Sequence, residues 1–398
     1  MNRAIVVLSL LGYWSFAVHS AQANPSKIMR RTLFGVLAVK TLSRVGSHQR
    51  ITSQRLSRLA SVARSEHSLD LVSPQFQDRE VEVIRISKAL ASLKSSRPEN
   101  YRSTDEVNLK LTQNRLPHLN LSGFDELHLS ASASPSEADI EFIKNQSKSG
   151  RSTLILDLQK EPHPLINGDK VIFYRNYNTA NDGKSREKII QDENQLVTEL
   201  RRKFLERHHR LDLREFEDDH FDYSNQQKRD AGHPIHSIAV AKVQTEESVV
   251  QNHTLHYERI PVSDLHSPTS EQADEFIQLF KKMKTYPEWP HLHIHCMAGR
   301  GRTTTFQVMY DLLRNSKNSQ IRSLNEVLDR HRFAYDRYEG IDLTQTIKED
   351  PNQTQWAKER LDFLKLFFRY TRDRPDFEIS FSEWIQHSKS NPPQLNTD

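Results

Sequence analysis

The feature that most constrains this chain is its only cysteine, which lies in the stretch His-Cys-Met-Ala-Gly-Arg-Gly-Arg-Thr at residues 295–303. In residues 291–295 histidines alternate with apolar residues, and a proline precedes them, which predicts a short strand. Residues 303–313 carry apolar side chains at helical spacing, which predicts a helix. The cysteine segment must therefore turn sharply from a strand into the first turn of a helix.

Such a turn is suited to hold a phosphate group beside a nucleophile. Backbone N–H groups at a helix N-terminus bind anions, and they favour the thiolate form of a cysteine. Arg302 offers a planar fork that matches two phosphate oxygens, and the Thr303 hydroxyl can donate to the Cys296 sulfur. His295 completes the pattern His-Cys-x5-Arg-Thr. The residues expected to line the phosphate are Met297, Ala298, Gly299, Arg300 and Gly301.

Two other interpretations of this segment are possible from its residues. A buried core cysteine is the usual fate of a lone thiol, but it would leave two glycines and two arginines unexplained. His291, His293 and His295 share one face of the expected strand and could suit a metal ion. No carboxylate lies at close spacing to them, so we expect no metal and no cofactor.

A cysteine phosphatase also needs an acid that protonates the departing oxygen, on a separate loop. Residues 255–262 predict a strand, and Asp264 follows directly after it. Asp264 is the predicted general acid. The alternative is that Asp264 caps the helix that begins near residue 270, but Ser267 or Thr269 is better placed for that role.

With these motifs the chain resembles the bacterial protein-tyrosine-phosphatase-like inositol phosphatases, often called cysteine phytases. The resemblance spans residues 100–388, and the blocks that carry it are 98–102, 127–133, 156–163, 166–168, 180–181, 243–246, 367–370 and Trp384, besides the two loops. It implies that Cys296 is the nucleophile, that Arg302 binds the scissile phosphate and that Asp264 is the acid. It also implies that flanking basic residues bind other phosphates, which by position are Lys160, Lys358 and Arg360.

Two positions depart from the family pattern. The family has His directly after the acid and Arg in the Asp-Leu-Arg stretch, whereas this chain has Leu265 and Gln159. His266 and Lys160 are each one residue away and are the candidates to replace the missing His and Arg in binding substrate, although a one-residue offset on a strand points to the opposite face. The resemblance therefore does not predict which position of the inositol ring loses its phosphate.

Arg300 bears on the substrate. A neutral residue would suffice to hold one phosphate, so a second arginine at the mouth of the loop favours a substrate with several phosphates. The alternative is a charge that faces solvent. Phosphoinositide lipid phosphatases also carry a basic residue there, but they have lysine at the position of Met297, which argues against that class.

The order of expected elements predicts an α/β fold with helices packed on a mixed sheet. The expected strands are 153–158, 170–174, 255–262 and 292–295, and the expected helices are 187–208, 270–284, 303–315 and 356–372. The resemblance adds a protein-tyrosine-phosphatase-like sheet and a smaller β-rich domain inserted before the acid loop, part of it near 209–251.

The termini are expected to lie outside this domain, which we place at 98–390 with a tail at 391–398. Residues 1–23 read as a signal peptide, so export to a periplasm, to the medium or into a host cell is expected. Residues 24–97 form a basic extension, in which 26–67 holds nine Lys and Arg against one Glu. A poorly ordered arm is the leading reading of 26–67, and contact with a membrane surface is the alternative.

Three hypotheses of function follow. The first is an inositol polyphosphate (phytate) phosphatase that acts through a phosphocysteine intermediate. The second is a phosphatase of phosphotyrosine or of a phosphoinositide lipid, for which the basic extension would be the docking surface. The third is a non-catalytic phosphate-binding module, disfavoured because nucleophile, arginine and acid are all present. No nucleic-acid-binding module is recognisable.

Overall fold

The computed structural model describes residues 82–86, 97–146, 151–174, 181–205, 210–216, 235–335 and 351–390. All of these belong to one compact unit of residues 72–398. The expected signal peptide, the basic segment 26–67 and the tail 391–398 lie outside the described residues. Within the described ranges no helix is both long enough and apolar enough to cross a membrane.

A five-stranded sheet forms the centre of the molecule, in the order β11-β4-β12-β3-β2. Its strands are β11 (His256–Val262), β4 (Thr153–Gln159), β12 (His291–Cys296), β3 (Leu129–Ala133) and β2 (Arg102–Ser103). The first four run parallel, and β2 pairs antiparallel at the edge. Every residue of β4 and β12 is buried, as expected when helices cover both faces of a parallel sheet. The predicted α/β fold with a mixed sheet is confirmed.

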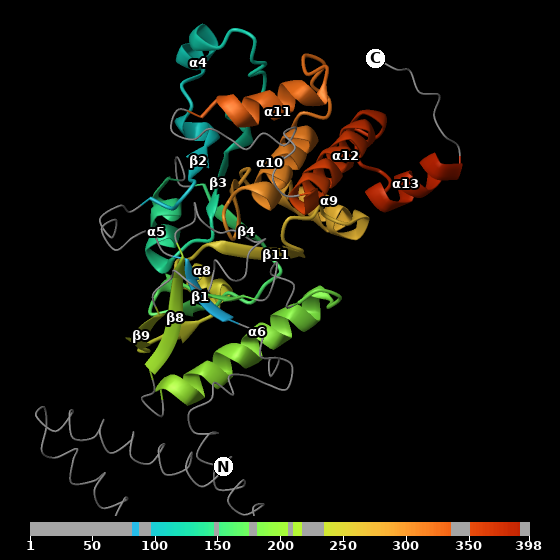
Figure 1. Cartoon of the computed structure of the whole chain (residues 1–398). Helices are drawn as coiled ribbons and strands as arrows, with labels where there is room; N and C mark the ends of the chain where they lie inside the picture. Colours follow the sequence, from blue (N-terminus) through green and yellow to red (C-terminus); the bar gives the residue numbers. More distant parts are fainter. Residues whose placement is uncertain are drawn as a thin grey trace, which may run out of the picture. The chain divides into compact units, whose positions relative to one another are not determined.

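Helices cover the two faces of this sheet (Figure 1). One face packs against α9 (Ser270–Met283), α10 (Gly301–Arg314), α12 (Pro351–Asp373) and α13 (Phe381–Ser390), and a core of leucine and aromatic side chains lies between them. The other face packs against α5 (Glu137–Gln146) and α8 (Glu246–Asn252). Alternation along β4 explains the division, because Leu154, Leu156 and Leu158 enter the first core and Ile155 enters the second.

The remaining helical elements include α11 (Leu324–Phe333), whose Leu324, Val327 and Leu328 also belong to the first core. The others are α4 (Leu109–Arg115), α6 (Arg186–Leu200), two 3-10 turns at Thr104–Glu106 and Asp125–Leu127, and a π-helical turn at Arg201–Leu205 that continues α6. Thr269 caps α9 through a capping box, as the sequence favoured over Asp264.

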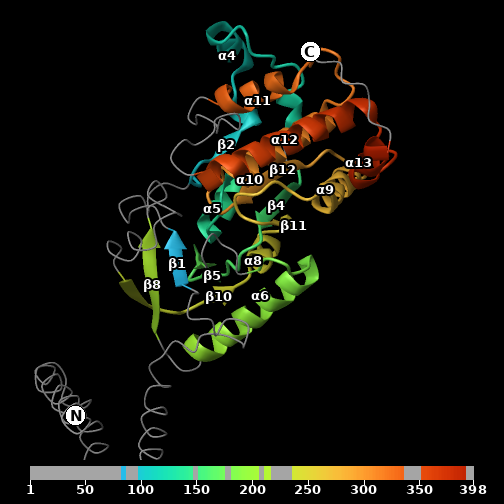
Figure 2. The ribbon, with the colours of Figure 1, turned by 45° about the vertical axis from the view of Figure 1, so that its right-hand side comes forward.

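Two smaller sheets accompany the central one (Figure 2). The first has the order β7-β1-β8-β9, formed by Ile172–Tyr174, Glu82–Ile86, Arg210–Phe216 and Ile235–Ala239. The second has the order β10-β5-β6, formed by Val243–Gln244, Leu165–Ile166 and Asp169–Lys170. Residues 209–251 thus supply β8, β9 and β10, and their assignment to an inserted domain stays a prediction.

Two sequence expectations need correction here. Strand β1 lies inside 24–97, which we expected to be an extension, yet it pairs with β7 and β8. The domain boundary at residue 98 therefore leaves out a strand of the folded unit. The single strand expected at 170–174 is two strands, because β6 pairs with β5 in one sheet and β7 pairs with β1 in another.

Candidate active site

The candidate catalytic residues meet at the carboxyl edge of the central sheet. Cys296 ends β12, Glu161 follows β4 and Asp264 follows β11. Because parallel strands point the same way, their carboxyl ends share one edge, where open α/β sheets bind their ligands. Residues that are far apart in the sequence therefore come together around the cysteine.

The catalytic loop, residues 296–301, has a backbone that only glycine permits at one point. Gly299 has a φ of +70°, and a Cβ atom built there would lie 2.3 Å from the Ser132 carbonyl carbon. The Met297 carbonyl accepts a hydrogen bond from the Ser134 N–H at 3.1 Å, and the Ala298 carbonyl accepts one from Asn100 Nδ2 at 2.9 Å. In a trans peptide the next N–H points opposite to the carbonyl, so the following amides turn away from these partners.

Arg302, the first arginine of α10, is buried and forms a bidentate pair with Glu161. Its two terminal nitrogens lie 2.8 Å from the two carboxylate oxygens. One of them also lies 3.0 Å from Asp264 Oδ1. Burial alone would lower the pKa of Arg302, but Asp264 and Glu161 raise it well above its ordinary value. The guanidinium therefore stays charged and joins the catalytic loop to the acid loop.

The acid loop, residues 263–269, is held against α12. Glu359 accepts hydrogen bonds from the Ser267 N–H at 3.1 Å and the Ser267 hydroxyl at 2.8 Å, and the His266 ring lies 3.2 Å from it. Arg360 donates to the Leu265 carbonyl. Leu265 has a φ of +68°, and its N–H donates to Asp264 Oδ1 at 2.9 Å. These contacts hold Asp264 beside Arg302, whereas the His266 ring faces α12.

Thr303 and His295 occupy different sides of the loop. The Thr303 hydroxyl is fully buried in the first turn of α10 and finds no hydrogen-bond partner among the described residues. The structure shows no hydrogen bond from this hydroxyl to Cys296, so its expected role as a donor stays a prediction. His295 is also buried, and its Nε2 lies 2.7 Å from Glu246 Oε1. Its ring therefore contacts Glu246, and its expected role in catalysis stays a prediction.

The four flanking basic residues differ in their surroundings. Arg360 is 7% exposed, and its guanidinium carbon lies 3.5 Å from where a Cβ of Gly301 would be. Burial lowers the pKa of Arg360 despite the nearby Asp264 and Glu359. Lys160 Nζ lies 3.0 Å from Ser263 Oγ, beside the acid loop, and Arg300 is the half-buried N-cap residue of α10.

Lys358 is not brought to the loop. Lys358 is exposed on α12. Residues two positions apart in a helix differ by about 200° around the axis, so Lys358 faces away from Arg360. The resemblance predicts both residues at the substrate from their positions in the chain, but the helix phase separates them.

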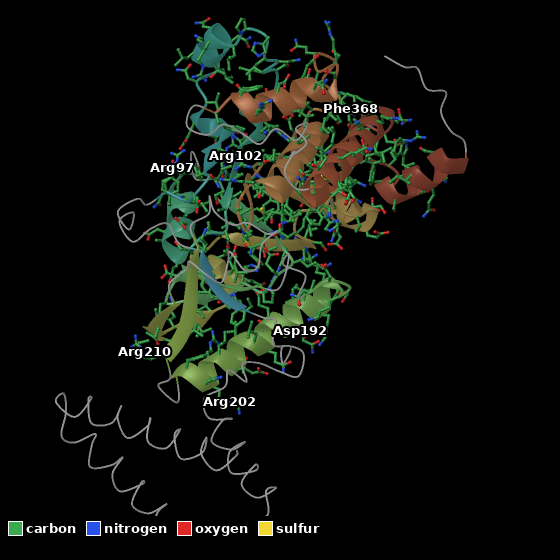
Figure 3. All side chains as sticks on the ribbon, in the orientation of Figure 1. Arg97, Arg102, Asp192, Arg202, Arg210 and Phe368 are labelled. Carbon is green, nitrogen blue, oxygen red and sulfur yellow. The ribbon has the colours of Figure 1, made fainter. Side chains whose placement is uncertain are left out.

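Several supporting residues escaped the sequence analysis. Glu161 orients Arg302, Glu359 anchors the acid loop and Asn100 clamps the Ala298 carbonyl. Arg102, labelled in Figure 3, donates to Gln307 and Thr304 of α10 and to the Asn100 carbonyl. Asn100 and Arg102 lie in the block 98–102 and Glu161 lies in 156–163, so the resemblance had marked these segments without a role.

Comparison with known proteins identifies a domain within this chain. Residues 156–314 match the model of the PTP-like phytase family, which carries the description "Inositol hexakisphosphate". Residues 156–314 are a PTP-like phytase domain. This stretch contains the Glu161 segment, the acid loop and the catalytic loop.

Solved structures of PTP-like phytases share the fold. The tandemly repeated enzyme from Mitsuokella multacida matches 81% of this chain and 50% of its own, with a TM-score of 0.64 and 24% identity. A PTP-like phytase from Bdellovibrio bacteriovorus matches 77% of this chain and 95% of its own, with a TM-score of 0.55 and 26% identity.

A curated bacterial protein is also similar. Effector protein hopD2 of Pseudomonas syringae pv. tomato is 27% identical over 237 residues, which are 59% of this chain and 46% of the relative. The chain thus spans about half the length of this relative and of the Mitsuokella phytase.

Proposed function

We propose that this protein is a cysteine-dependent phosphomonoester hydrolase that acts on inositol polyphosphates, including the hexakisphosphate. The observation that carries the proposal is the meeting of three groups at one sheet edge. Cys296 ends β12, Arg302 begins the next helix, and Asp264 lies 3.0 Å from that arginine. A nucleophile, an anion-binding fork and an acid are the parts that phosphoryl transfer through cysteine requires.

The first chemical step forms a phosphocysteine. The Cys296 thiolate bonds to phosphorus, and the bond between phosphorus and the inositol oxygen breaks. Asp264 gives its proton to that oxygen, so the product leaves as an alcohol. The loop amides and Arg302 hold the three other phosphate oxygens as charge builds on them.

The second step restores the enzyme. A water oxygen attacks phosphorus, the Asp264 carboxylate takes a proton from this water, and the sulfur–phosphorus bond breaks. Inorganic phosphate leaves, Cys296 is again a thiolate and Asp264 is again protonated. The Thr303 hydroxyl, which is buried without a partner among the described residues, donates to the sulfur when the thiolate departs.

The charge around the loops favours a substrate with several phosphates. Arg360 lies against Gly301, Lys160 contacts the acid loop and Arg300 occupies the N-cap position of α10. A single phosphate needs only Arg302 and the loop amides, so further cations attract phosphates that are not cleaved.

A matched pair of variants tests this substrate class. Arg300→Ala should raise KM for inositol hexakisphosphate about 5- to 100-fold, the worth of one charge-assisted contact, and change KM for an aryl monophosphate little. Lys358→Ala, on the exposed side of α12, should leave both unchanged. Equal kcat/KM on the hexakisphosphate and on a phosphotyrosine peptide, with Arg300→Ala neutral, would favour a phosphotyrosine or lipid phosphatase instead.

We also propose that the chain is exported. The support is the composition of residues 1–23 and the similarity to a relative named an effector protein. Fractionation of producing cells that carry a tagged full-length chain tests the proposal, with a deletion of residues 1–23 as the control. The full-length chain should leave the cytoplasm and the deletion should stay. A full-length chain that fractionates with a cytoplasmic marker would overturn it.

A further inference from the structure

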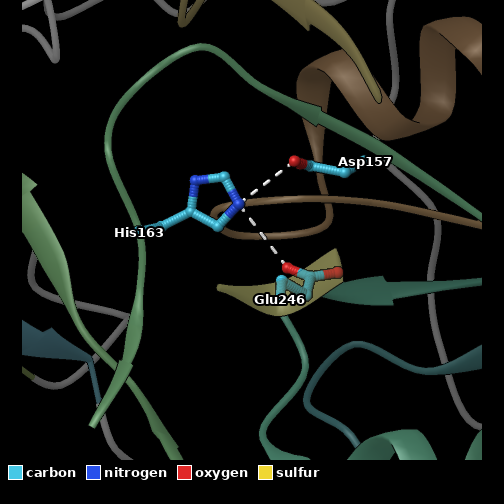
Figure 4. A group of neighbouring side chains, drawn as sticks. All are labelled: Asp157, His163 and Glu246. Atoms are coloured by element: carbon cyan, nitrogen blue, oxygen red, sulfur yellow. Dashed lines mark ion pairs between the residues drawn. The ribbon is translucent and has the colours of Figure 1, made fainter. Parts of the chain in front are cut away.

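A buried polar cluster lies beneath the catalytic loop. Asp157 comes from β4, His163 from the segment after β4 and Glu246 from the start of α8, and all three are buried (Figure 4). His163 Nε2 lies 3.1 Å from Asp157 Oδ2 and 3.5 Å from Glu246 Oε2. One ligand atom from each of the three residues lies within 4.8 Å of the other two.

The hydrogen bonding of His163 fixes which of its nitrogens faces the carboxylates. Its Nδ1 lies 2.7 Å from the Glu161 carbonyl oxygen and 3.3 Å from Arg259 Nη2, and because a carbonyl oxygen can only accept, the shorter contact assigns the hydrogen to Nδ1. Nε2 then points between the two carboxylates, yet it has no aligned hydrogen-bond partner among the described residues. A histidine whose Nδ1–H donates to a backbone carbonyl while Nε2 faces carboxylates is arranged as a metal ligand.

Glu246 supplies an independent observation. Both of its carboxylate oxygens are buried and accept no hydrogen bond within the described part of the chain. A buried carboxylate without donors is costly unless a cation lies against it. Its near neighbours are two imidazoles, with His295 Nε2 2.7 Å from Oε1 and His163 Nε2 3.5 Å from Oε2.

The charges of the cluster leave room for one divalent cation. Asp157, Glu193 and Glu246 contribute three negative charges, and Arg259 offsets one of them through contacts of 3.0 Å to Asp157 and Glu193. The remaining two negative charges are balanced either by one divalent ion or by two protonated histidines.

We propose that Asp157, His163 and Glu246 bind one divalent transition-metal ion of the Zn²⁺ type. Bonds of about 2.0–2.2 Å at roughly tetrahedral angles separate ligand atoms by about 3.1–3.6 Å, which matches the two His163 distances. Because all three residues are buried, the site is structural. It ties β4 and α8 together below the strand that ends in Cys296.

Metal analysis tests this independently of any phosphatase activity. Tag-free full-length protein is purified without chelators, dialysed, and its metal content per chain is measured by mass spectrometry. The proposal expects about one zinc-type ion in the wild type and a loss of most of it in Glu246→Gln. The control is His331→Asn, which alters another buried histidine, one that lies 2.9 Å from Asp311, and which should keep the ion.

A second measurement covers variants that fail to fold. Stripping the wild-type protein with a strong chelator should lower Tm by at least about 5 °C, and added Zn²⁺, but not Mg²⁺, should restore it. A wild-type protein that contains no metal, and whose Tm changes neither with the chelator nor with added Zn²⁺, would overturn the site and assign the cluster to two protonated histidines. A bound ion that survives in Glu246→Gln would also overturn it.

Discussion

Arg302 donates its two terminal nitrogens to the two carboxylate oxygens of Glu161, each at 2.8 Å. Both side chains are buried. Glu161 follows β4, and Arg302 lies in the first turn of α10, the helix that follows the neighbouring strand β12. A guanidinium that is already held in position loses little freedom when phosphate binds. The pair therefore preorganises the fork that binds phosphate in the proposed reaction.

Replacing Glu161 should lower kcat more than it raises KM. In Glu161→Gln one charged acceptor of the bidentate pair is lost, so we expect kcat to fall about 10- to 100-fold, as for a misplaced catalytic group, with a smaller change in KM. Glu161→Asp should recover part of the loss. Glu106→Gln, which breaks the exposed pair with Arg97, is the control. An unchanged kcat in Glu161→Gln would show that Arg302 needs no such support.

Gly299→Ala should abolish activity by moving the loop. The new Cβ would lie 2.3 Å from the Ser132 backbone, closer than real Cβ contacts allow. Gly183→Ala is a matched control, because Gly183 also has a positive φ, +79°, but has nothing within 4 Å of the added atom. Steady-state rates and Tm of both variants separate the steric clash from backbone strain. An active Gly299→Ala enzyme would mean that the loop tolerates a different path.

Asp264→Asn tests the general acid through the leaving group. The rate on inositol polyphosphates should fall about 10²- to 10⁴-fold, the usual worth of a positioned acid. The phenolate of an aryl phosphate leaves without protonation, so the rate on this substrate should fall much less. The ratio of kcat values on the two substrates is the measurement. If both fell equally, Asp264 would serve only to hold Arg302, and His266 would be the next acid to test.

The parts of the site that are local in sequence were predicted from sequence. The strand, the turn with Gly299 and the helix that follows are set by adjacent residues, so Cys296 to Thr303 could be assigned from one segment. Asp264 followed in the same way from the end of an expected strand. The structure then places Asp264 beside Arg302, as the chemistry requires.

The missed features depend on distant pairings or on helix phase. Glu161 meets Arg302 only because β4 and β12 are neighbours, and no pattern near residue 161 reveals that. Strand β1 finds its partners β7 and β8 far along the chain. The sequence expectation of no metal weighed only the three histidines before Cys296, whereas the proposed site joins Asp157, His163 and Glu246 from separate elements.

The buried pair of Asp311 and Arg330 should make stability depend on acid pH. Burial alone would raise the pKa of Asp311, but Arg330 and His331 lower it below its ordinary value. A carboxylate with a lowered folded pKa stabilises the protein above its unfolded pKa of about 4, and that contribution is lost as pH falls below it.

Urea unfolding from pH 7 to pH 3 checks this. Asp311→Asn should be less stable by about 3–5 kcal/mol at pH 7, because it leaves a buried guanidinium unpaired. The difference from the wild type should shrink as pH falls. A constant difference across this range would show that Asp311 is not charged in the folded protein.

The central claim is a covalent intermediate on Cys296 during hydrolysis of an inositol polyphosphate. The most direct test mixes enzyme with inositol hexakisphosphate, quenches within one turnover and measures the mass of the peptide that contains residue 296. We predict one added phosphoryl group on that peptide in the wild type, and neither this adduct nor phosphate release in Cys296→Ser. Phosphate release by Cys296→Ser at a rate close to that of the wild type, or a phosphoryl group on another residue, would contradict the account.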